Sequence, residues 1–385
     1  RGEGIDPKRD ARVGRRLAEQ GVRAQDGRGL TGAVEPVPDV GAVVVELVAR
    51  VSGFGPLQPF LDDPAVEEIW LNAPDRVFIA RNGRHELTNL VLTADVVREL
   101  VECYAAAGLH GAYTTGTDGE VHVMEVEDLK QLVPPFAETA ASVGLPIQVG
   151  CGWSHTNGVI ERGRVAREHG VGIIQVTLPA WIPLHDDEVV RFYGAIGDAL
   201  PELLLIHYNI MRSGRMMNGR DFQRAHAVAP NLAGSKHTGG NISLLAEIID
   251  ATPDMAHFAV DSDIVTGALF GSPGYYSFIA NISPAFALSM MDACTRGDWK
   301  TAAELARYCL RFFRCWLPMC PDINSSAALG KIATAAGVFP EMPLIIKEPY
   351  TSGTERHVRE LRELIQREFP ELSENQHVEI REEQA

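Results

Sequence analysis

Lysine is scarce in this chain of 385 residues, and its scarcity narrows the search for a reactive amine. The lysines are Lys8, Lys130, Lys236, Lys300, Lys331 and Lys347. Only Lys236 ends a strand-like apolar run, at residues 232–236, and a glycine-rich stretch follows it. Because a lysine is rarely buried without a partner or a function, Lys236 is the candidate for an amine nucleophile.

Other features that the sequence lacks exclude whole classes of protein. The six cysteines show no CxxC spacing and no Cys/His cluster, so we predict no metal site and expect a reducing, cytoplasmic location. No apolar run approaches the ~20 residues that span a bilayer, and we recognise no signal peptide. No GxxxxGK(S/T) motif is present, which excludes a phosphate-binding loop of that kind.

The charge balance argues against two kinds of partner. The formal net charge is -16, because acidic residues outnumber basic ones. A strongly negative chain is repelled by nucleic acid and by anionic membranes, so we expect neither as the main partner.

Residues 1–93 are predicted to form a small α+β module. Residues 43–51 have the spacing of a short amphipathic helix, and residues 66–71 are a possible strand. Residues 76–92 are typical of a hairpin, because Asn82-Gly83 lies between two apolar runs and Asn-Gly is the strongest short hairpin signal.

From residue 94 helical patterns alternate with short apolar strands. The strands are predicted at 111–116, 146–151, 171–178, 202–208, 232–236, 257–261 and 274–281. This alternation indicates a parallel sheet with crossover helices, and a (β/α)₈ TIM barrel over residues 94–300 is the leading expectation. Residues 301–385 are predicted as a C-terminal helical extension; helices at about 284–318, 322–337 and 354–367 would form this layer.

Two side chains end successive predicted strands, where the active sites of such barrels lie. Tyr208 and Asn209 end the strand at 202–208, and Lys236 ends the next one. An amine in an apolar site loses solvation of its charged form, and the neutral amine can attack a carbonyl carbon to form a Schiff base. Tyr208 would be the phenolic acid/base beside it. A core tyrosine and a surface lysine are the alternatives.

Two further groups are candidates for binding an anion. Gly116-Thr117-Asp118-Gly119-Glu120 follows the strand at 111–116, and small residues there allow backbone N–H groups to approach a carboxylate. Arg212 and Arg215 follow Tyr208, and a guanidinium group suits a substrate carboxylate. A plain glycine turn and solvated surface charge are the alternatives. Tyr275 and Tyr276, in the last predicted strand, are expected in the core.

These motifs, in this order, resemble the dihydrodipicolinate synthase / N-acetylneuraminate lyase family. Gly116 to Glu120, Tyr208-Asn209 and Gly234-Ser235-Lys236 carry the resemblance, which covers about 94–368. It implies a class I aldolase-type barrel without metal or cofactor, usually tetrameric.

The resemblance also implies residue roles. Lys236 would form the Schiff base with pyruvate or another 2-oxo acid, whose partner is an aldehyde or a sugar acid. Tyr208 and Thr117 would move protons. Gly116 and Thr117 would hold the carboxylate, with Asp118, Asn209, Arg212 and Arg215 as further substrate-binding residues.

The sequence departs from the family pattern at three places. Asp118 stands where members usually have a second hydroxyl residue, and the stretch at 178–181 lacks their relay tyrosine. Ser213 occupies the place of an arginine that members with dihydrodipicolinate synthase activity usually have. That particular activity is therefore disfavoured, and the second substrate is left open.

Residues 5–100 resemble a different family, the N-terminal domain of CpaF/TadA-type secretion ATPases. Gly53 to Pro59, Val66 to Ile69 and Asn72 to Val77 carry this resemblance, but no ATPase core follows. The usual first barrel strand of the aldolase family is missing before residue 94, so it is absent or replaced by residues 89–92. The missing strand leaves one alternative open, an impaired fusion acting as a secretion-system interaction module. The other alternative is a dehydratase or decarboxylase of the same fold that uses the same imine.

Overall fold

The computed structural model describes residues 66–73, 76–81, 84–87 and 94–373. The chain divides into two compact units, Arg1–Leu90 and Val91–Ala385. In the first unit, β1 (Val66–Ala73), β2 (Arg76–Arg81) and β3 (Arg84–Leu87) form an antiparallel sheet in that order. The predicted strand and both arms of the predicted hairpin are therefore present. The predicted helix at 43–51 and the Asn82-Gly83 turn lie outside the described residues.

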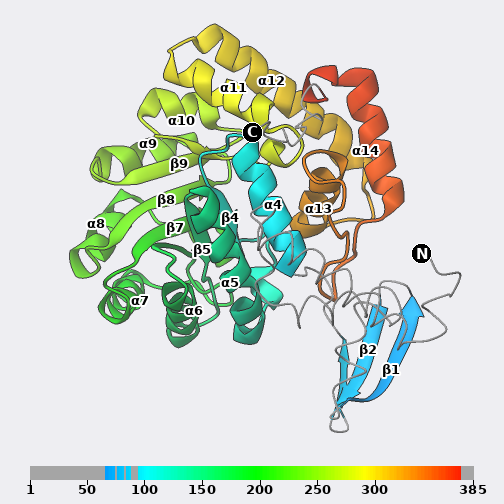
Figure 1. Ribbon diagram of the computed structural model, residues 1–385. Helices are drawn as coiled ribbons and strands as arrows, with labels where there is room; N and C mark the ends of the chain where they lie inside the picture. Colours follow the sequence, from blue (N-terminus) through cyan, green and yellow to red (C-terminus); the bar gives the residue numbers. More distant parts are fainter. Residues whose placement is uncertain (1–65, 74–75, 82–83, 88–93, 374–385) are drawn as a thin grey trace, which may run out of the picture. The chain divides into compact units, whose positions relative to one another are not determined.

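The second unit is built on a parallel sheet of seven strands whose spatial order follows the chain (Figure 1). Each strand overlaps a predicted one and pairs only with its neighbours in sequence. The strands are β4 (Ala112–Thr114), β5 (Ile147–Gly150), β6 (Ile173–Val176), β7 (Leu204–Ile210), β8 (Leu232–Thr238), β9 (Ala256–Val260) and β10 (Tyr275–Tyr276).

Helices alternate with these strands and lie on the outer side of the curled sheet (Figure 1). They are α4 (Ala94–Ala106), α5 (Val126–Val143), α6 (Thr156–Glu168), α7 (Asp186–Ala199), α8 (Gly219–Val228), α9 (Ile242–Ala251) and α10 (Ile264–Phe270). Local signals explain where they begin. The Asn218 side chain caps α8 by accepting the Asp221 N–H at 3.0 Å. Three acidic residues in the first turn of α7 complement the helix dipole.

The predicted (β/α)₈ barrel is observed in part, as a curled sheet of seven parallel strands, and the described residues contain no further strand in the place of the expected missing one. In the part of the chain that the structure describes, β4 and β10 are the two edge strands of the sheet, and no strand joins them. The two ends approach through side chains instead: the rings of Tyr113 in β4 and Tyr276 in β10 lie 5.6 Å apart, edge to face. The Tyr104 hydroxyl of α4 donates to the Asn281 side chain at 2.8 Å. The proposed replacement strand at 89–92 lies outside the described residues.

Two hydrophobic cores support this unit. The first lies between the sheet and its helices and includes Leu129, Ile174 and Phe222. The second joins the end of the sheet to the C-terminal helices and includes Ile279 and Phe312. Because the second core continues from η4 (Ile279–Asn281) into the C-terminal helices, the last helices are packed on the sheet unit over a shared apolar surface.

The C-terminal helices are α11 (Pro284–Thr295), α12 (Trp299–Trp316), α13 (Ser326–Ala336) and α14 (Glu355–Glu368). The helix predicted at 284–318 is interrupted where Gly297 adopts a positive φ of 70°. The expected boundary between residues 300 and 301 falls in the first turn of α12. Among the described residues, no helix combines the length and apolar character needed to cross a bilayer.

Candidate active site

Lys236 lies in β8, where the sheet register places it opposite Tyr208 of β7 and Phe258 of β9. Gly234 makes this arrangement possible. A Cβ atom at that residue would lie 1.9 Å from the carbonyl oxygen of Ala256, so only glycine allows β8 and β9 to approach so closely. The close packing of β8, which carries the lysine, against β9 therefore depends on the absence of a side chain at Gly234.

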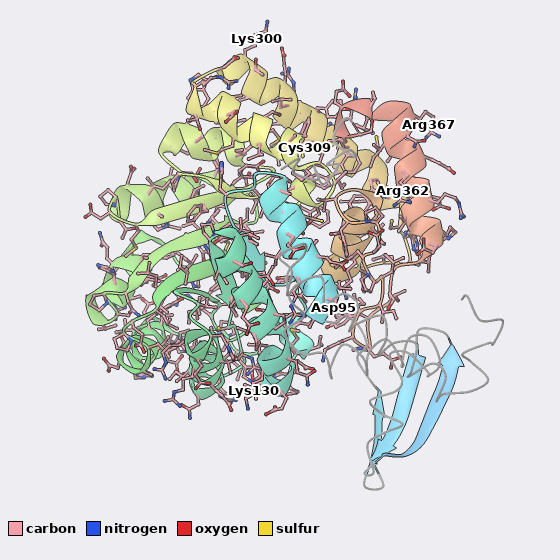
Figure 2. The ribbon with its side chains drawn as sticks, in the orientation of Figure 1. Asp95, Lys130, Lys300, Cys309, Arg362 and Arg367 are labelled. Atoms are coloured by element: carbon pink, nitrogen blue, oxygen red, sulfur yellow. The ribbon has the colours of Figure 1, made fainter. Side chains whose placement is uncertain are left out.

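The other described lysines have different surroundings. Lys130 and Lys300 project from α5 and α12 away from the sheet (Figure 2). Lys347 pairs with Asp128, with 2.7 Å between Nζ and the carboxylate. Lys331 is buried and pairs with Glu120. Among the described lysines, Lys236 alone has its amine over aromatic rings.

Three tyrosine rings surround the Lys236 amine. Its Nζ lies 4.3 Å from the ring centre of Tyr208, 4.9 Å from that of Tyr276 and 5.3 Å from that of Tyr113. Ring faces attract a cation within about 6 Å. We call these three residues the tyrosine cage. The expected proximity of Tyr208 to Lys236 is observed, whereas sequence reasoning missed Tyr113 and assigned Tyr276 to the core.

The cage phenols that contact Lys236 from β4 and β10 are neutral at physiological pH. Burial raises the pKa of Tyr276 to about 12, although its hydrogen bond to Gln148 acts in the opposite direction. Burial raises the pKa of Tyr113 well above its usual value, and the neighbouring phenols and Asp118 add to the effect. Neutral phenols can donate a proton to a departing oxygen.

The loop after β4 folds tightly beside the cage. A Cβ atom at Gly116 would lie 2.5 Å from the Tyr113 ring, and one at Gly119 would lie 2.4 Å from the Thr115 amide nitrogen. Thr115 itself has a positive φ of 56°, which is unusual for a residue with a branched side chain. Because Tyr113 contacts both Gly116 and the Lys236 amine, the predicted anion-binding loop lies next to the predicted nucleophile. Thr117 is half-buried in this turn, and Asp118 is exposed.

A buried ion pair anchors this loop to the C-terminal helices. Glu120 lies 3.2 Å from Lys331 Nζ in α13, and both side chains are almost fully buried. Burial lowers the pKa of Lys331, while the Glu120 carboxylate opposes this shift. Glu120 also accepts the Lys347 backbone N–H at 2.6 Å. Sequence reasoning missed this connection.

Asn209 is turned away from the cage and fixes the chain that follows β7. Its side-chain amide donates to the Met217 carbonyl at 2.9 Å and accepts the Met217 N–H at 2.8 Å. His207, on the same outer face of the strand, bonds Asn209 at 3.3 Å and the Tyr193 hydroxyl at 2.5 Å. Burial lowers the pKa of His207 to about 3, so its ring is neutral. These contacts fix the Asn209 side chain to Met217, and its predicted role in substrate binding stays a prediction.

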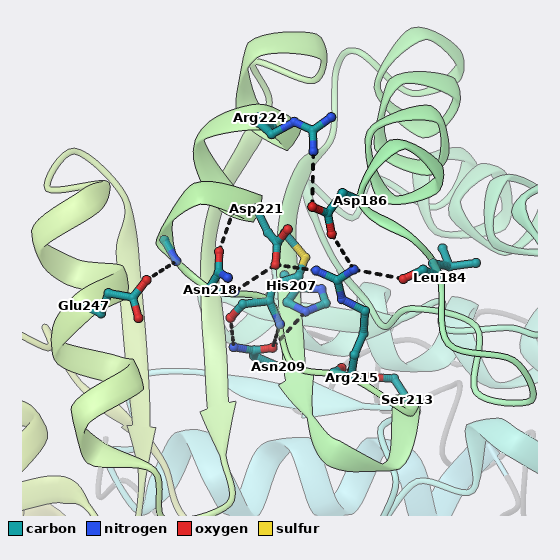
Figure 3. A network of polar contacts seen from close by, with 12 residues as sticks. Leu184, Asp186, His207, Asn209, Ser213, Arg215, Asn218, Asp221, Arg224 and Glu247 are labelled. Carbon is teal, nitrogen blue, oxygen red and sulfur yellow. Dashed lines mark hydrogen bonds and ion pairs between the residues drawn. The ribbon is translucent and has the colours of Figure 1, made fainter.

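Arg215 lies in a second network, shown with Asn209 in Figure 3. Its guanidinium bonds the Asp221 carboxylate at 2.6 Å, the Asp186 carboxylate at 3.0 Å and the Leu184 carbonyl at 2.9 Å. Asp221 is buried. Both terminal nitrogens of Arg215 therefore already contact protein acceptors, and its predicted role in substrate binding stays a prediction.

Arg212 is exposed in η3 (Met211–Ser213), the turn after β7. The pKa of His122 in η2 (Val121–Val123) is lowered, and burial is the main cause. The positive charge of Arg212 lowers it further. The loops that follow β4 and β7 therefore approach each other at the carboxyl edge of the sheet. Arg212 is available there to meet an anionic group.

A buried carboxyl group that the sequence did not indicate lies at the end of β9. Asp261 accepts the Ser277 hydroxyl at 2.8 Å and the Phe278 N–H at 2.5 Å. Burial raises its pKa to about 6, although these bonds and the charge of Lys236 act in the opposite direction. Asp261 therefore titrates near neutral pH and is influenced by the charge of the predicted nucleophile.

A parallel α/β sheet with an amine, phenols and a glycine-rich loop at its carboxyl edge defines an enzyme of the class I aldolase type. A model of the dihydrodipicolinate synthetase family matches residues 88–368, and the chain belongs to this family. The predicted family and the predicted Schiff-base lyase or aldolase function are confirmed. The match begins at residue 88, so the likeness of residues 5–100 to secretion ATPases stays a prediction.

The chain is similar to individual proteins in sequence or in fold. The chain is similar to the 4-hydroxy-tetrahydrodipicolinate synthase of Thermomicrobium roseum, with 30% identity over 212 residues, 54% of this chain and 69% of the relative. The sialic acid aldolase of Ruminococcus gnavus has a similar fold, with a TM-score of 0.65, 19% identity, and coverage of 74% of this chain and 94% of that one. So does the dihydrodipicolinate synthase of Acinetobacter baumannii complexed with pyruvate, with a TM-score of 0.62, 24% identity, and coverage of 71% and 92%.

Proposed function

We propose that Lys236 carries the reaction of this enzyme by forming an imine with the carbonyl carbon of pyruvate or another 2-oxo acid. The observation that carries the proposal is the position of the Lys236 amine, opposite Tyr208 in the register and enclosed by the tyrosine cage. The complex of the Acinetobacter baumannii relative with pyruvate supports this choice of substrate.

Formation of the imine needs an amine and a proton donor, and the site contains both. The neutral amine attacks the carbonyl carbon and a C–N bond forms. The carbonyl oxygen takes one proton from the attacking nitrogen and one from an acid of the site and leaves as water, and the nitrogen remains as a positively charged iminium. Tyr208, whose ring centre lies 4.3 Å from Nζ, is the proposed donor of a proton to the departing oxygen. Thr117 is the proposed second member of this proton relay.

The carboxylate of the 2-oxo acid is proposed to bind in the turn formed by Gly116 and Thr117. This loop packs on Tyr113, which also contacts the amine, so an acid bound there would present its neighbouring carbonyl carbon to Lys236. Arg212 and Asp118, both exposed beside this turn, are proposed to meet the charged group and a hydroxyl of the second substrate.

The second substrate is proposed to be an aldehyde, or a sugar acid that is cleaved to pyruvate and an aldehyde. A dehydratase or decarboxylase of the same fold would use the same imine. Product analysis with a panel of sugar acids separates them, because only cleavage releases pyruvate together with an aldehyde.

We also propose a cytoplasmic homotetramer. Family members are usually tetrameric, and apolar side chains beside the site are available for a contact between copies. Trp181 is 92% exposed, Ile182 70% and Met211 63%. Native mass spectrometry tests the assembly: a monomer at working concentration would contradict it.

Borohydride trapping with pyruvate, followed by peptide mass mapping, tests the imine. A reduced adduct on the peptide that contains Lys236 is expected in the wild type and in Lys300→Ala, whose altered lysine is exposed on α12. No adduct is expected in Lys236→Ala. An adduct on another lysine, or none with any 2-oxo acid, would refute the proposal.

A further inference from the structure

We propose that Tyr276 is a catalytic residue of this site, whose ring face keeps the Lys236 nitrogen positively charged after the imine has formed. This inference rests on the proposed imine and adds a residue to it. The ring centre of Tyr276 lies 4.9 Å from Lys236 Nζ, a distance at which a ring face attracts a cation.

The backbone of β10 points the Tyr276 ring into the curled sheet. Successive side chains of a strand face opposite ways. The neighbouring Tyr275 donates its hydroxyl to the Ala287 carbonyl of α11 at 2.7 Å, which places Tyr275 on the helix side of the strand. Tyr276 therefore faces the opposite side, where Lys236 lies. The two adjacent tyrosines have different surroundings although the sequence presents them as a pair.

The Tyr276 side chain is fixed at both ends. Its backbone belongs to β10, and its hydroxyl donates to the Gln148 side chain in β5, across the interior of the sheet. The rings of Tyr113 and Phe258 pack edge to face against it, each with 5.6 Å between ring centres. A ring fixed by one hydrogen bond and two aromatic contacts has little freedom to turn its face away from the amine.

A second buried amide lies at this point of the interior. Gln175 in β6 is 1% exposed, and neither atom of its amide makes a hydrogen bond of normal geometry in the described part of the chain. It lies near enough to the Tyr276 hydroxyl to lower the pKa of that group. Two glutamines therefore lie at the hydroxyl of Tyr276. The hydroxyl interacts with these amides, and the ring face interacts with the Lys236 nitrogen.

The charge of the nitrogen matters for the reaction. An ammonium group and a ketone give an iminium and water, so one positive charge is present before and after this step. The protonated iminium withdraws electrons from the adjacent carbon, whereas the neutral imine does so much less. Ring faces of the cage favour the charged form over the neutral one. The ring of Tyr276, rather than its hydroxyl, is therefore the group that matters.

The test compares Tyr276→Phe, which keeps the ring, with Tyr276→Leu, which removes it. Tyr275→Leu is the control, because it removes a ring from the same strand on the helix side. Cyanoborohydride reduces the protonated iminium, so its trapping rate at saturating pyruvate is measured from mildly acidic to alkaline pH. In Tyr276→Leu the alkaline loss of trapping is expected to begin about one pH unit lower. Tyr276→Phe and Tyr275→Leu are expected to retain the wild-type profile.

Two results would overturn the inference. One is an unchanged profile in Tyr276→Leu; the other is an equal shift in Tyr276→Phe, which would make the hydroxyl the active group. If the wild type forms no adduct, the proposed imine fails. The cage is then tested without any oxo acid, by the pH dependence of Lys236 acetylation mapped by peptide mass. An acetylation curve shifted to lower pH in Tyr276→Leu, but not in Tyr276→Phe or Tyr275→Leu, supports the cage. Identical curves in all variants refute it.

Discussion

Glu120 and Lys331 form a buried ion pair of 3.2 Å that joins the loop after β4 to α13. The Glu120 carboxylate also accepts the Lys347 N–H from the segment between α13 and α14. One side chain thereby fixes the predicted anion-binding loop to two parts of the C-terminal region. The C-terminal helices are therefore part of what shapes the candidate site.

Replacing Lys331 with Met is expected to lower the free energy of unfolding by about 3–5 kcal/mol, because Glu120 is left buried without its partner. Chemical denaturation measures the loss. The double variant Lys331→Met with Glu120→Gln should recover much of it, since no uncompensated charge remains. Lys130→Met, which breaks an exposed ion pair with Glu127, should cost about 0.5 kcal/mol or less. Equal losses in the two single variants would contradict the role of burial.

Replacing Gly234 with Ala is expected to push β8 away from β9, because the new methyl group would lie 1.9 Å from the Ala256 carbonyl oxygen. The displacement should reduce pyruvate trapping at Lys236 by about 100-fold, in line with the sensitivity of reactions to a shift of about 1 Å. Gly172→Ala is the matched control: no atom lies within 4 Å of its added Cβ, and its φ is not positive. Trapping equal to the wild type in Gly234→Ala would show that the sheet accommodates the methyl group.

Replacing Arg215 with Met tests whether this arginine is scaffold or substrate contact. Asp221, buried at 5% exposure, would lose its partner, and a destabilisation of about 3 kcal/mol is expected. The KM for pyruvate should change little. Arg167→Met, which breaks an exposed pair with Glu202, should alter neither quantity much. A large rise in KM with unchanged stability would support the prediction that Arg215 binds substrate.

Asp261 should make stability depend on pH. Burial raises its pKa from 3.8 to about 6, so the folded state holds the proton more tightly than the unfolded state. The stabilisation of about 3 kcal/mol is present in full below about pH 4 and is lost as the pH rises through about 6. Asp261→Asn removes this titration, so the difference in unfolding free energy between the wild type and the variant should change across this window.

The control for this experiment lies in the same protein. Burial lowers the pKa of His207 to about 3 and that of His257 to about 4, so these rings destabilise the fold as the pH falls. Both histidines are present in wild type and variant, so their effect cancels in the difference. A difference that stays constant between pH 4 and 6 would show that Asp261 is ionised throughout.

The sequence predicted the seven strands because each is a short apolar run bounded by helical patterns. It also predicted Tyr208 and Lys236 as neighbours, since both end such runs. These signals are local. Closure of the sheet is not local: whether β4 meets β10 depends on chain ends far apart in sequence, and β4 is only three residues long.

The missed site residues have the same explanation. Tyr276 faces the inside of a curled sheet, which is core and site together, so its apolar neighbours gave no sign of function. Tyr113 lies in a strand too short to show which way its side chains point. Glu120 and Lys331 are joined only by the packing of α13, and nothing in either local sequence indicates the other.

The strand order has a consequence for how the protein is made. Because each strand pairs only with its neighbours in sequence, the sheet can grow one unit at a time as the chain leaves the ribosome. The tyrosine cage cannot, since Tyr113 comes from the first strand of the sheet and Tyr276 from the last. A truncated or unfinished chain would carry the lysine without its full enclosure, because only the final strand completes the tyrosine cage.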